Sequence, residues 1–364
     1  MKRAAAPVQR PRRAAARGAA LLAAMLTVTL VATFAATAMW QQWRAVEVET
    51  SERARVQSAW LLVGALDWSR LILREDLFAR GGDGTDHLAE PWAVPLEEAR
   101  LSTFLAAGPD GAAAEADAST DTANAFLSGQ IIDLQSRLNV YNLVEGKAIS
   151  ATALRQFTRL FESLGLPQPE LQGLAANLQR TLSVSGGNAA TGPGGAPDGT
   201  PAAGQTAAAQ GSAAPPTDLS SVPLMPRSFT QLTWLGLSPA TVAALEPYAT
   251  LLPRRTPVNI NTASAQVLQA SIDGLDMAGA QRLVQARESQ HFKTLSDASR
   301  QLGGTLQIAS ETHSTMSAYY EVRGRLRLGD TVVEERSLVY KAGSTARTLW
   351  RERGAFVRST APAT

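Results

Sequence analysis

The chain has 364 residues and a formal net charge of +2, from 34 Lys and Arg against 32 Asp and Glu. Six of the basic residues and none of the acidic ones lie within positions 1–17, which leaves the remaining body with a net charge of −4. This body lacks the excess of cations that bulk attraction to nucleic acid requires. The absence of cysteine excludes a disulfide framework, so apolar burial must supply the stability.

The first predicted element is a membrane helix over residues 19–40, which contain no charged side chain. At about 1.5 Å per residue this segment extends about 33 Å, enough to cross a hydrocarbon core of about 30 Å. The preceding cations keep residues 1–17 in the cytoplasm, and Trp40 and Trp43 then lie at the outer interface, where indole rings are favoured. The sequence therefore predicts a single-pass protein with a cytoplasmic N-terminus and an exported body.

A sharp junction precedes the apolar segment at Arg17, Gly18 and Ala19. A secretory signal peptide would place its cleavage site after the apolar segment. The arrangement here resembles a type IV prepilin leader, in which a dedicated prepilin peptidase cuts after the glycine. This resemblance implies cleavage between Gly18 and Ala19. An ordinary uncleaved signal anchor fits the same residues equally well.

Helical periodicity continues beyond the membrane segment. From Val56 onward, apolar residues recur at steps of three and four, which is typical of one face of a helix. The predicted apolar stripe consists of Ala59, Trp60, Val63, Leu66, Leu73 and Leu77. Glycines from Gly81 end the pattern, so one helix from about residue 19 to about residue 78 would extend about 90 Å. Its outer third needs a partner surface.

Residues 145–309 are predicted to form an all-α domain. Amphipathic helices are expected over 151–164 and 169–182, with Leu171, Leu174 and Leu178 on the apolar face of the second. The segment 185–226 is rich in Gly, Ala and Pro and holds too few apolar side chains to order itself, so it is predicted to be a flexible linker.

A weak internal repeat follows the linker. Residues 235–245 align without gaps on 273–283, and each copy predicts a Gly-containing turn that opens a helix. Between the copies, residues 257–268 predict a short extended segment that leads into a further helix, capped by Thr262 or a neighbouring residue.

The C-terminal stretch changes to a period of two. Residues 319–328 and 331–340 alternate around a Gly-Asp turn, and residues 348–353 predict a third strand. The predicted fold class is α+β, with a long N-terminal membrane and stalk helix packed on a C-terminal antiparallel sheet and a large inserted all-α domain. The predicted division is 1–18 leader, 19–43 membrane helix, 44–144 stalk helix and first part of the body, 145–309 inserted α-domain, and 310–364 sheet completing the body.

Several segments together carry a resemblance to one family. They are the Gly18 junction, residues 86–92, 132–143 and 258–264, and the C-terminal hairpin. The chain resembles the K-type minor pseudopilins of type II secretion systems (general secretion pathway protein K). The resemblance implies an inner-membrane protein with a pilin-like periplasmic body. It also implies a structural place at the tip of the pseudopilus that supports export of folded proteins across the outer membrane. The implied partners are other minor pseudopilins, the major pseudopilin, the prepilin peptidase and secreted proteins.

One departure from general pilins concerns assembly. Most pilins carry a glutamate as the fifth residue of the mature chain, and the resemblance places Ala23 at this position. A carboxylate inside the bilayer costs several kcal/mol unless it is paired. A first subunit, with no predecessor whose terminal amine it could pair with, gains nothing from that carboxylate. Ala23 therefore fits the K type and the tip.

A second departure concerns calcium, which the family resemblance implies for an Asp-rich stretch of the α-domain. This chain has the Gly/Ala/Pro linker there, with only Asp198 and Asp218, twenty residues apart. Calcium requires several oxygen ligands that converge on one point. The other candidate pair, Asp83 and Asp86 beside a glycine turn, is more typical of an ordinary loop. We therefore predict no metal site and no cofactor.

The alternative function is a membrane-anchored receptor for DNA uptake. Residues 258–264 and the following Gly hairpin also resemble a helix-hairpin-helix module, which binds phosphate through backbone N–H groups. Ser238 and Asp276 occupy the second edges of the two hairpins, and Asp276 would direct a negative charge at the phosphate. Arg282 and Arg287 follow, offset in part by an adjacent glutamate. Nucleic acid is therefore the less favoured partner.

An enzyme is not predicted. The three histidines, His87, His291 and His313, fall in three predicted modules without metal-ligand spacing. The sequence contains neither a Gly-x-Ser-x-Gly elbow nor a phosphate-binding loop of the Walker type. No catalytic residue is assigned.

Overall fold

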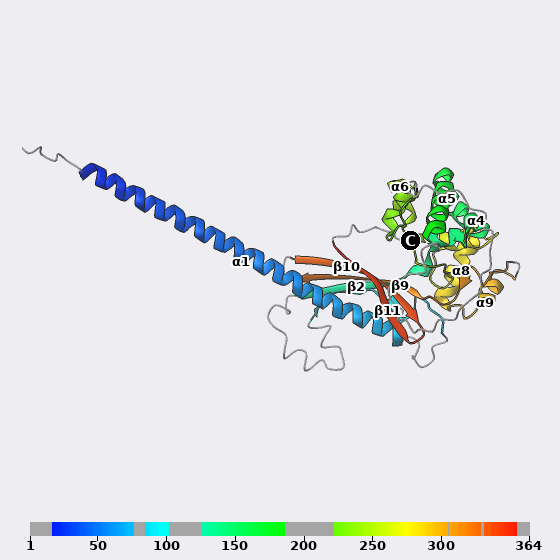
Figure 1. The fold of residues 1–364 in the computed structure, drawn as a ribbon. Helices are drawn as coiled ribbons and strands as arrows, with labels where there is room; N and C mark the ends of the chain where they lie inside the picture. The colour runs from blue at the N-terminus through cyan, green and yellow to red at the C-terminus, as the bar shows by residue number, and fades with distance from the viewer. Residues whose placement is uncertain are drawn as a thin grey trace, which may run out of the picture.

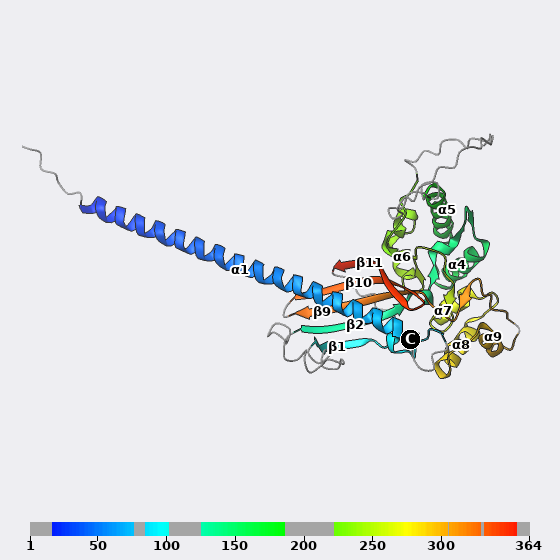
Figure 2. The same cartoon turned by 60° about the horizontal axis from the view of Figure 1, so that its bottom comes forward.

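The computed structural model describes residues 17–75, 84–101, 125–185, 222–304, 306–328 and 331–354. Most of the predicted leader and of the predicted linker falls outside these residues. A single helix, α1, projects from a body in which an antiparallel sheet lies against its C-terminal part (Figure 1). A group of helices lies at the end of the molecule farthest from the N-terminus of α1 (Figures 1 and 2).

Helix α1 (Arg17–Glu75) is 59 residues long and runs without a break from the apolar segment into the body. It is the one helix of the described residues that is long and apolar enough to cross a membrane. Within the apolar segment, the hydroxyls of Thr27, Thr29 and Thr33 donate to backbone carbonyls three residues earlier, at 2.8–3.0 Å. Each hydroxyl thus finds its partner inside the helix, as a bilayer requires.

The buried face of α1 differs from the predicted apolar stripe. The buried positions are Ser58, Leu62, Leu66, Ser69 and Leu73, whereas Trp60 is 71% exposed. The prediction is confirmed for Leu66 and Leu73 and wrong for Trp60, because it counted apolar residues only and missed the two serines. Both serines donate to carbonyls of their own helix, Ser58 to Ala54 and Ser69 to Ala65, so their burial leaves no hydroxyl unsatisfied. Leu77 lies outside the described residues.

The body is a five-stranded sheet in the order β1-β2-β9-β10-β11, with every neighbouring pair antiparallel. Its strands are β1 (Leu96–Arg100), β2 (Ala125–Asp133), β9 (Tyr319–Leu328), β10 (Thr331–Ala342) and β11 (Thr345–Gly354). The three C-terminal strands were predicted, whereas β1 and β2 were not. Helix α1 packs on β9, β10 and β11, and Arg70 and Arg74 fix it by donating to carbonyls of the β10–β11 hairpin, of Ala346 and Ser344.

The helical domain contains α4, α5, α6, α7, α8 and α9 around the largest apolar core of the molecule. Their bounds are α4 (Ala151–Ser163), α5 (Gln168–Ser185), α6 (Pro239–Leu245), α7 (Ala265–Ser271), α8 (Met277–Ser289) and α9 (Leu295–Gln301), with the 3-10 segment η7 (Phe229–Leu235) before α6. Leu171, Leu174 and Leu178 are fully buried, as the apolar face of α5 predicts. The two repeats open α6 and α8 after Gly236 and Gly274, which both have positive φ.

The domain is not purely helical, which corrects the all-α expectation. Two pairs of two-residue strands join it to neighbouring segments: β3 (Leu138–Asn139) pairs with β6 (Ala249–Thr250), and β7 (Val258–Asn259) with β8 (His313–Ser314). A third pair, β4 (Val144–Glu145) with β5 (Ala148–Ile149), is a local hairpin. Buried loop backbone needs hydrogen-bond partners, and these bridges supply them. The predicted α+β fold class is confirmed, with the long helix, the C-terminal antiparallel sheet and the helical domain all present.

Candidate functional site

The predicted processing and assembly residues all lie in the first turns of α1. Gly18 and Ala19 are helical, with no break in the backbone between them, and the side chain of Ala23 is exposed on the helix surface. The residues before Arg17 lie outside the described part of the chain. Cleavage between Gly18 and Ala19 and the assembly role of Ala23 therefore stay predictions.

The three internal segments that carry the family resemblance converge in space, although they are far apart in sequence. Residues 86–92, 132–143 and 258–264 meet where the start of β9 adjoins the helical domain. The 3-10 segments η2 (Pro91–Ala93), η4 (Leu134–Ser136) and η5 (Val140–Leu143) belong to this region. We call the cluster of Asp86, Asp133, Asn259, Thr262, Ser317, Tyr320 and Lys341 the polar junction. All seven side chains are buried.

Asp86 ties the first segment to the sheet. Its carboxylate accepts hydrogen bonds from the Ser317 backbone N–H at 2.7 Å and from the Tyr320 hydroxyl, and it forms an ion pair with the Lys341 ammonium. Lys341 lies on β10 and Tyr320 on β9, so a single carboxylate holds two adjacent strands. Asp86 is 2% exposed, and such a buried charge is tolerated only when it is paired and hydrogen-bonded.

Asp133 ties the end of β2 to the helical domain. One carboxylate oxygen accepts from the Thr262 hydroxyl at 2.5 Å and from the Ser317 hydroxyl at 2.6 Å, and the other accepts from the Gln135 N–H at 2.7 Å. The Asn259 amide donates to Asp133 at 3.3 Å and to the Asp86 carbonyl at 3.0 Å. Asn259 therefore joins all three segments. The predicted cap of α7 was Thr262 or a neighbouring residue, and it is Ser264, whereas Thr262 serves the junction.

Two amides of the second segment extend the polar junction. Gln135 donates to the Pro257 carbonyl at 3.2 Å and accepts from the Ala318 N–H at 2.7 Å. Asn139 donates to the Arg254 carbonyl at 2.7 Å and accepts from the Leu252 N–H at 3.1 Å. The helical domain is thus fastened to the body through directional bonds. Such bonds fix one orientation more strictly than apolar contact does.

Burial shifts the pKa values of two groups in the polar junction. Burial raises the pKa of Asp133 to about 6, with a smaller contribution from the nearby charge of Asp86, while the hydrogen bonds from Ser317 and Thr262 oppose the shift. Burial also raises the pKa of Tyr320 well above its usual range, with the Asp86 carboxylate adding to the effect. The phenol therefore stays protonated and donates to Asp86.

The raised pKa of Asp133 predicts a pH dependence. Since the pKa rises from 3.8 in the unfolded chain to about 6 in the folded one, the stabilisation from its proton is fully present below pH 3.8 and is lost as the pH rises through about 6. A pKa difference of one unit between the two states corresponds to about 1.4 kcal/mol. When the pH falls from 7 to 4, the free energy of unfolding of wild type should therefore rise by on the order of 3 kcal/mol relative to that of Asp133→Asn. Denaturant unfolding of the two full chains in detergent measures this difference. A difference that does not change with pH would contradict the prediction.

Within the part of the chain that the structure describes, the acidic residues do not fit a calcium site. Among the described residues no group of three or more acidic, histidine or cysteine side chains converges on one point. Both oxygens of Asp86 are already engaged by protein donors, and a lysine ammonium lies against it. Asp83, Asp198 and Asp218 lie outside the described residues. The expectation that this chain holds no metal stays a prediction.

The two hairpins do not leave a phosphate site open at the helix ends. The Ser238 N–H at the start of α6 donates to the Glu170 carboxylate at 2.9 Å, and this bond is the main reason why the pKa of Glu170 is lowered. At the start of α8 the Asp276 carboxylate accepts from the Gly279 N–H at 2.8 Å. A carboxylate therefore already occupies each position where a phosphate would bind.

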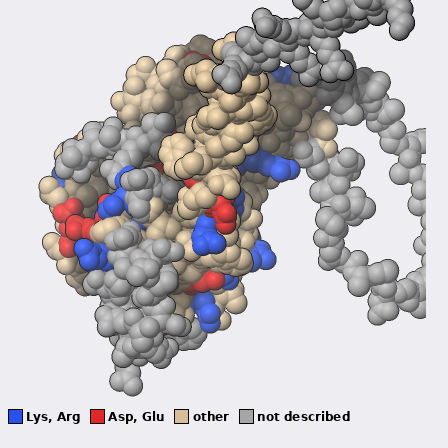
Figure 3. Space-filling model, turned by 90° about the vertical axis from the view of Figure 1, so that its left-hand side faces the viewer, with Lys and Arg blue, Asp and Glu red and all other residues tan. Residues whose placement is uncertain are grey.

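Of the two cations named for the DNA hypothesis, Arg282 is exposed, whereas Arg287 is engaged by the protein itself. Arg287 donates to the carbonyls of Ile260 and Ala263 at 2.8 and 2.5 Å, and burial lowers its pKa to about 10. On the face seen in Figure 3, basic and acidic side chains are interspersed and form no basic strip. Nothing in the described residues favours the alternative function.

The histidines are placed differently from the sequence expectation. His87 and His291, assigned to separate modules, stack with ring centroids 3.8 Å apart. His87 also lies 3.5 Å from the Glu90 carboxylate, which binds the buried Trp92 indole. His313 bonds to Ser271 at 3.0 Å, and burial lowers its pKa to about 4, so it is a neutral core residue. Within the described residues these histidines serve packing.

These features define a class: an α+β protein with one helix fit to span a membrane, a sheet packed on that helix, and a helical domain fixed to the sheet. Models of type II secretion system protein K match residues 136–254 and 258–316. The chain is 28% identical over 296 residues to the type II secretion system protein K of Pseudomonas aeruginosa (strain PAO1), covering 77% of this chain and 76% of that protein. Over these residues the chain is similar to the type II secretion system protein K family.

A solved structure supports the same fold. The chain is similar to a chain of the GspK-GspI-GspJ complex from the enterotoxigenic Escherichia coli type 2 secretion system, with a TM-score of 0.53 and 16% identity. The similarity covers 84% of this chain and 99% of that one. The family is a structural component of the secretion system and is not known as an enzyme.

Proposed function

We propose that this chain is a minor pseudopilin at the tip of a type II secretion pseudopilus, where it supports export of folded proteins from the periplasm across the outer membrane. In this proposal, α1 anchors the subunit in the inner membrane with its N-terminus in the cytoplasm. After the prepilin peptidase cuts behind Gly18, the same helix joins the helices of the major and minor pseudopilins.

The observation that carries the tip placement is the position of the helical domain. It lies beyond the end of α1 that is farthest from the membrane segment (Figure 2), and the polar junction fixes it there. A domain of this width at the end of a stalk obstructs further subunits above it, whereas the shaft below stays narrow. The similarity to the family and to a chain of the solved GspK-GspI-GspJ complex supports other minor pseudopilins as partners.

The absence of a carboxylate at Ala23 gives a test of the tip placement. Ala23→Glu would put an unpaired carboxylate in the bilayer, because a first subunit has no preceding terminal amine to pair with. The cost is roughly 2–3 kcal/mol on insertion scales, so less protein should assemble and secretion should fall. Secretion of a reporter exoprotein and labelling of isolated pseudopili measure the two effects.

Ala23→Leu is the matched control, since it keeps the position apolar and helical, and it should secrete as wild type does. A glutamate variant that secretes normally and is found along the whole fibre would show that the subunit is an ordinary shaft component.

A further inference from the structure

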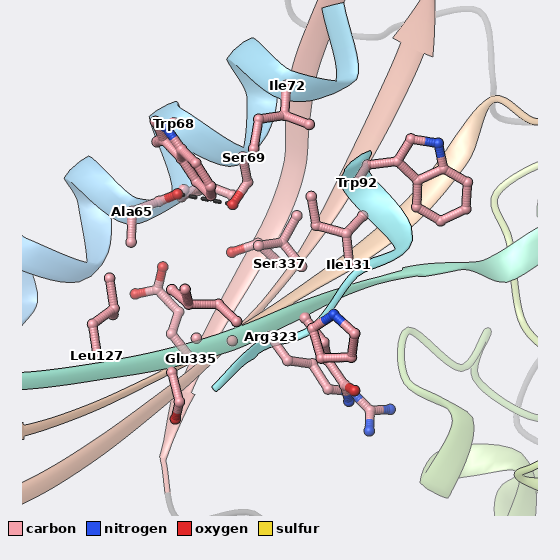
Figure 4. Close-up of a pocket in the computed structure, with 18 of the residues that line it drawn as sticks. Ala65, Trp68, Ser69, Ile72, Trp92, Leu127, Ile131, Arg323, Glu335 and Ser337 are labelled. Carbon is pink, nitrogen blue, oxygen red and sulfur yellow. Dashed lines mark hydrogen bonds between the residues drawn. The ribbon is translucent and has the colours of Figure 1, made fainter. Parts of the chain in front are cut away.

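A cavity of about 240 Å³ lies between α1 and the sheet (Figure 4), and no residue of the polar junction lines it. Helix α1 packs on β9, β10 and β11, and Leu127 to Ile131 of β2 line the cavity beside it. The segment from Pro91 to Leu96 forms the opposite wall. The lining is mostly apolar, with Leu66 and Ile72 from α1, Trp92 from the wall and Ile131 from β2.

Two glycines create the hollow floor. Gly129 of β2 and Gly324 of β9 are direct partners in the sheet register, so no side chain rises from either position. A Cβ on Gly324 would lie 3.1 Å from the Leu62 side chain, and one on Gly129 would lie 2.8 Å from the Arg323 carbonyl. Larger residues at these positions would conflict with α1 or the sheet, so the space is built into the strand pairing.

Two polar groups of β10 line this apolar space. The Ser337 side chain is 1% exposed, and its hydroxyl finds no hydrogen-bond partner among the described residues. Glu335 is 4% exposed, and its two oxygens are held by Arg351 at 3.1 Å and by Arg353 at 2.7 Å. A buried hydroxyl without a partner is costly, so an occupant that supplies one would bind with a gain.

The mouth of the cavity is apolar and open. Trp68 of α1 and Val94 of the wall both line the cavity, yet they are 42% and 67% exposed. Exposed apolar side chains around a buried pocket are typical of a protein–protein contact in which one anchor residue enters the pocket.

The volume of the cavity and the charges that line it indicate which partner side chain would fit. The cavity is smaller than the pockets of about 300–1,000 Å³ that hold small molecules, but it can take one large side chain. Glu335 is already neutralised by two arginines, so a cationic anchor would find no free counter-charge. An aromatic ring with an O–H or N–H donor matches the apolar walls and the Ser337 hydroxyl together.

We infer that this cavity receives a tyrosine or tryptophan side chain from a neighbouring minor pseudopilin. The inference rests on the proposed function and names how the partner is held. The partner's ring packs between α1 and the wall, and its polar hydrogen is donated to Ser337.

The first test fills the cavity with a larger side chain of this chain. Ser337→Leu places an apolar side chain in the space and removes the unpartnered hydroxyl, so the protein should keep or raise its melting temperature. Its affinity for the minor pseudopilins of the same system should fall about 10-fold or more, as expected when an anchor residue is excluded. The measurement is thermophoresis on the full chain in detergent. Val332→Leu is the matched control, because it lies on the same strand with a 45% exposed side chain and does not line the cavity.

A second measurement does not depend on the folding of Ser337→Leu. Val94→benzoylphenylalanine places a photo-cross-linker at the exposed mouth, and mass spectrometry of the adduct should identify a pseudopilin peptide with a tyrosine or tryptophan. Two results would overturn the inference and leave the pseudopilin role intact. One is a folded Ser337→Leu protein that binds as tightly as wild type, and the other is a Val94→benzoylphenylalanine protein that cross-links to detergent and lipid alone. A wild-type chain that binds no minor pseudopilin at all would instead contradict the proposed function itself.

Discussion

Replacing Lys341 with methionine is expected to lower the free energy of unfolding by about 3–5 kcal/mol, because it leaves the buried Asp86 carboxylate without its counter-charge. Asp86 and Lys341 form an ion pair in which both side chains are less than a tenth exposed. Methionine keeps the length and the apolar stem of lysine, so the loss reports the charge. Denaturant unfolding of the full chain in detergent, followed by near-ultraviolet circular dichroism, measures the change.

Two variants make this expectation specific. Arg53→Met breaks the ion pair between Glu49 and Arg53, whose side chains are 74% and 69% exposed, and should change stability by no more than about 0.5 kcal/mol. Asp86→Asn combined with Lys341→Met removes both charges and should lose less than Lys341→Met alone. If Lys341→Met were no more destabilising than Arg53→Met, the ion pair would not hold the junction.

Replacing Gly18 with valine is expected to leave a membrane-bound precursor and to abolish secretion. The peptidase must approach the backbone closely at the cut, and glycine has no Cβ that would obstruct it. A β-branched residue at this position obstructs that approach most. Mobility on an immunoblot and the N-terminal sequence of the purified protein measure processing, and export of a reporter exoprotein measures function.

Gly64→Val is the matched control, since Gly64 lies in the same helix and a Cβ there would meet nothing within 4 Å. It should be processed and should secrete as wild type does. Equal mobility of Gly18→Val and wild type would rule out prepilin processing. A wild-type chain that begins at Met1 would show that the apolar segment is an uncleaved signal anchor.

The strongest predictions from sequence were those in which one face of an element is buried over its whole length. The α5 leucines recur with helical spacing and are fully buried. Residues 319–328 alternate in sequence and form β9, although its first four residues are buried on both faces. Strand β2 was missed even though Ala125, Leu127 and Ile131 alternate, because Gly129 and the polar residues between them weaken the pattern. The signal was present, but a glycine in mid-strand is more typical of a loop.

The sequence by itself determined the apolar span, the strand hairpin and the amphipathic helices, because these depend on composition and on short-range periodicity. The family was indicated separately, by the resemblance of several motifs. The tertiary structure alone decided which face of α1 is buried, since two serines that bond to their own helix replace apolar residues there. It also decided the polar junction and the cavity. Asp86, Asp133 and Asn259 come from segments more than forty residues apart, and Gly129 meets Gly324 only in the register of β2 and β9. Such sites depend on long-range pairing, which no local pattern encodes.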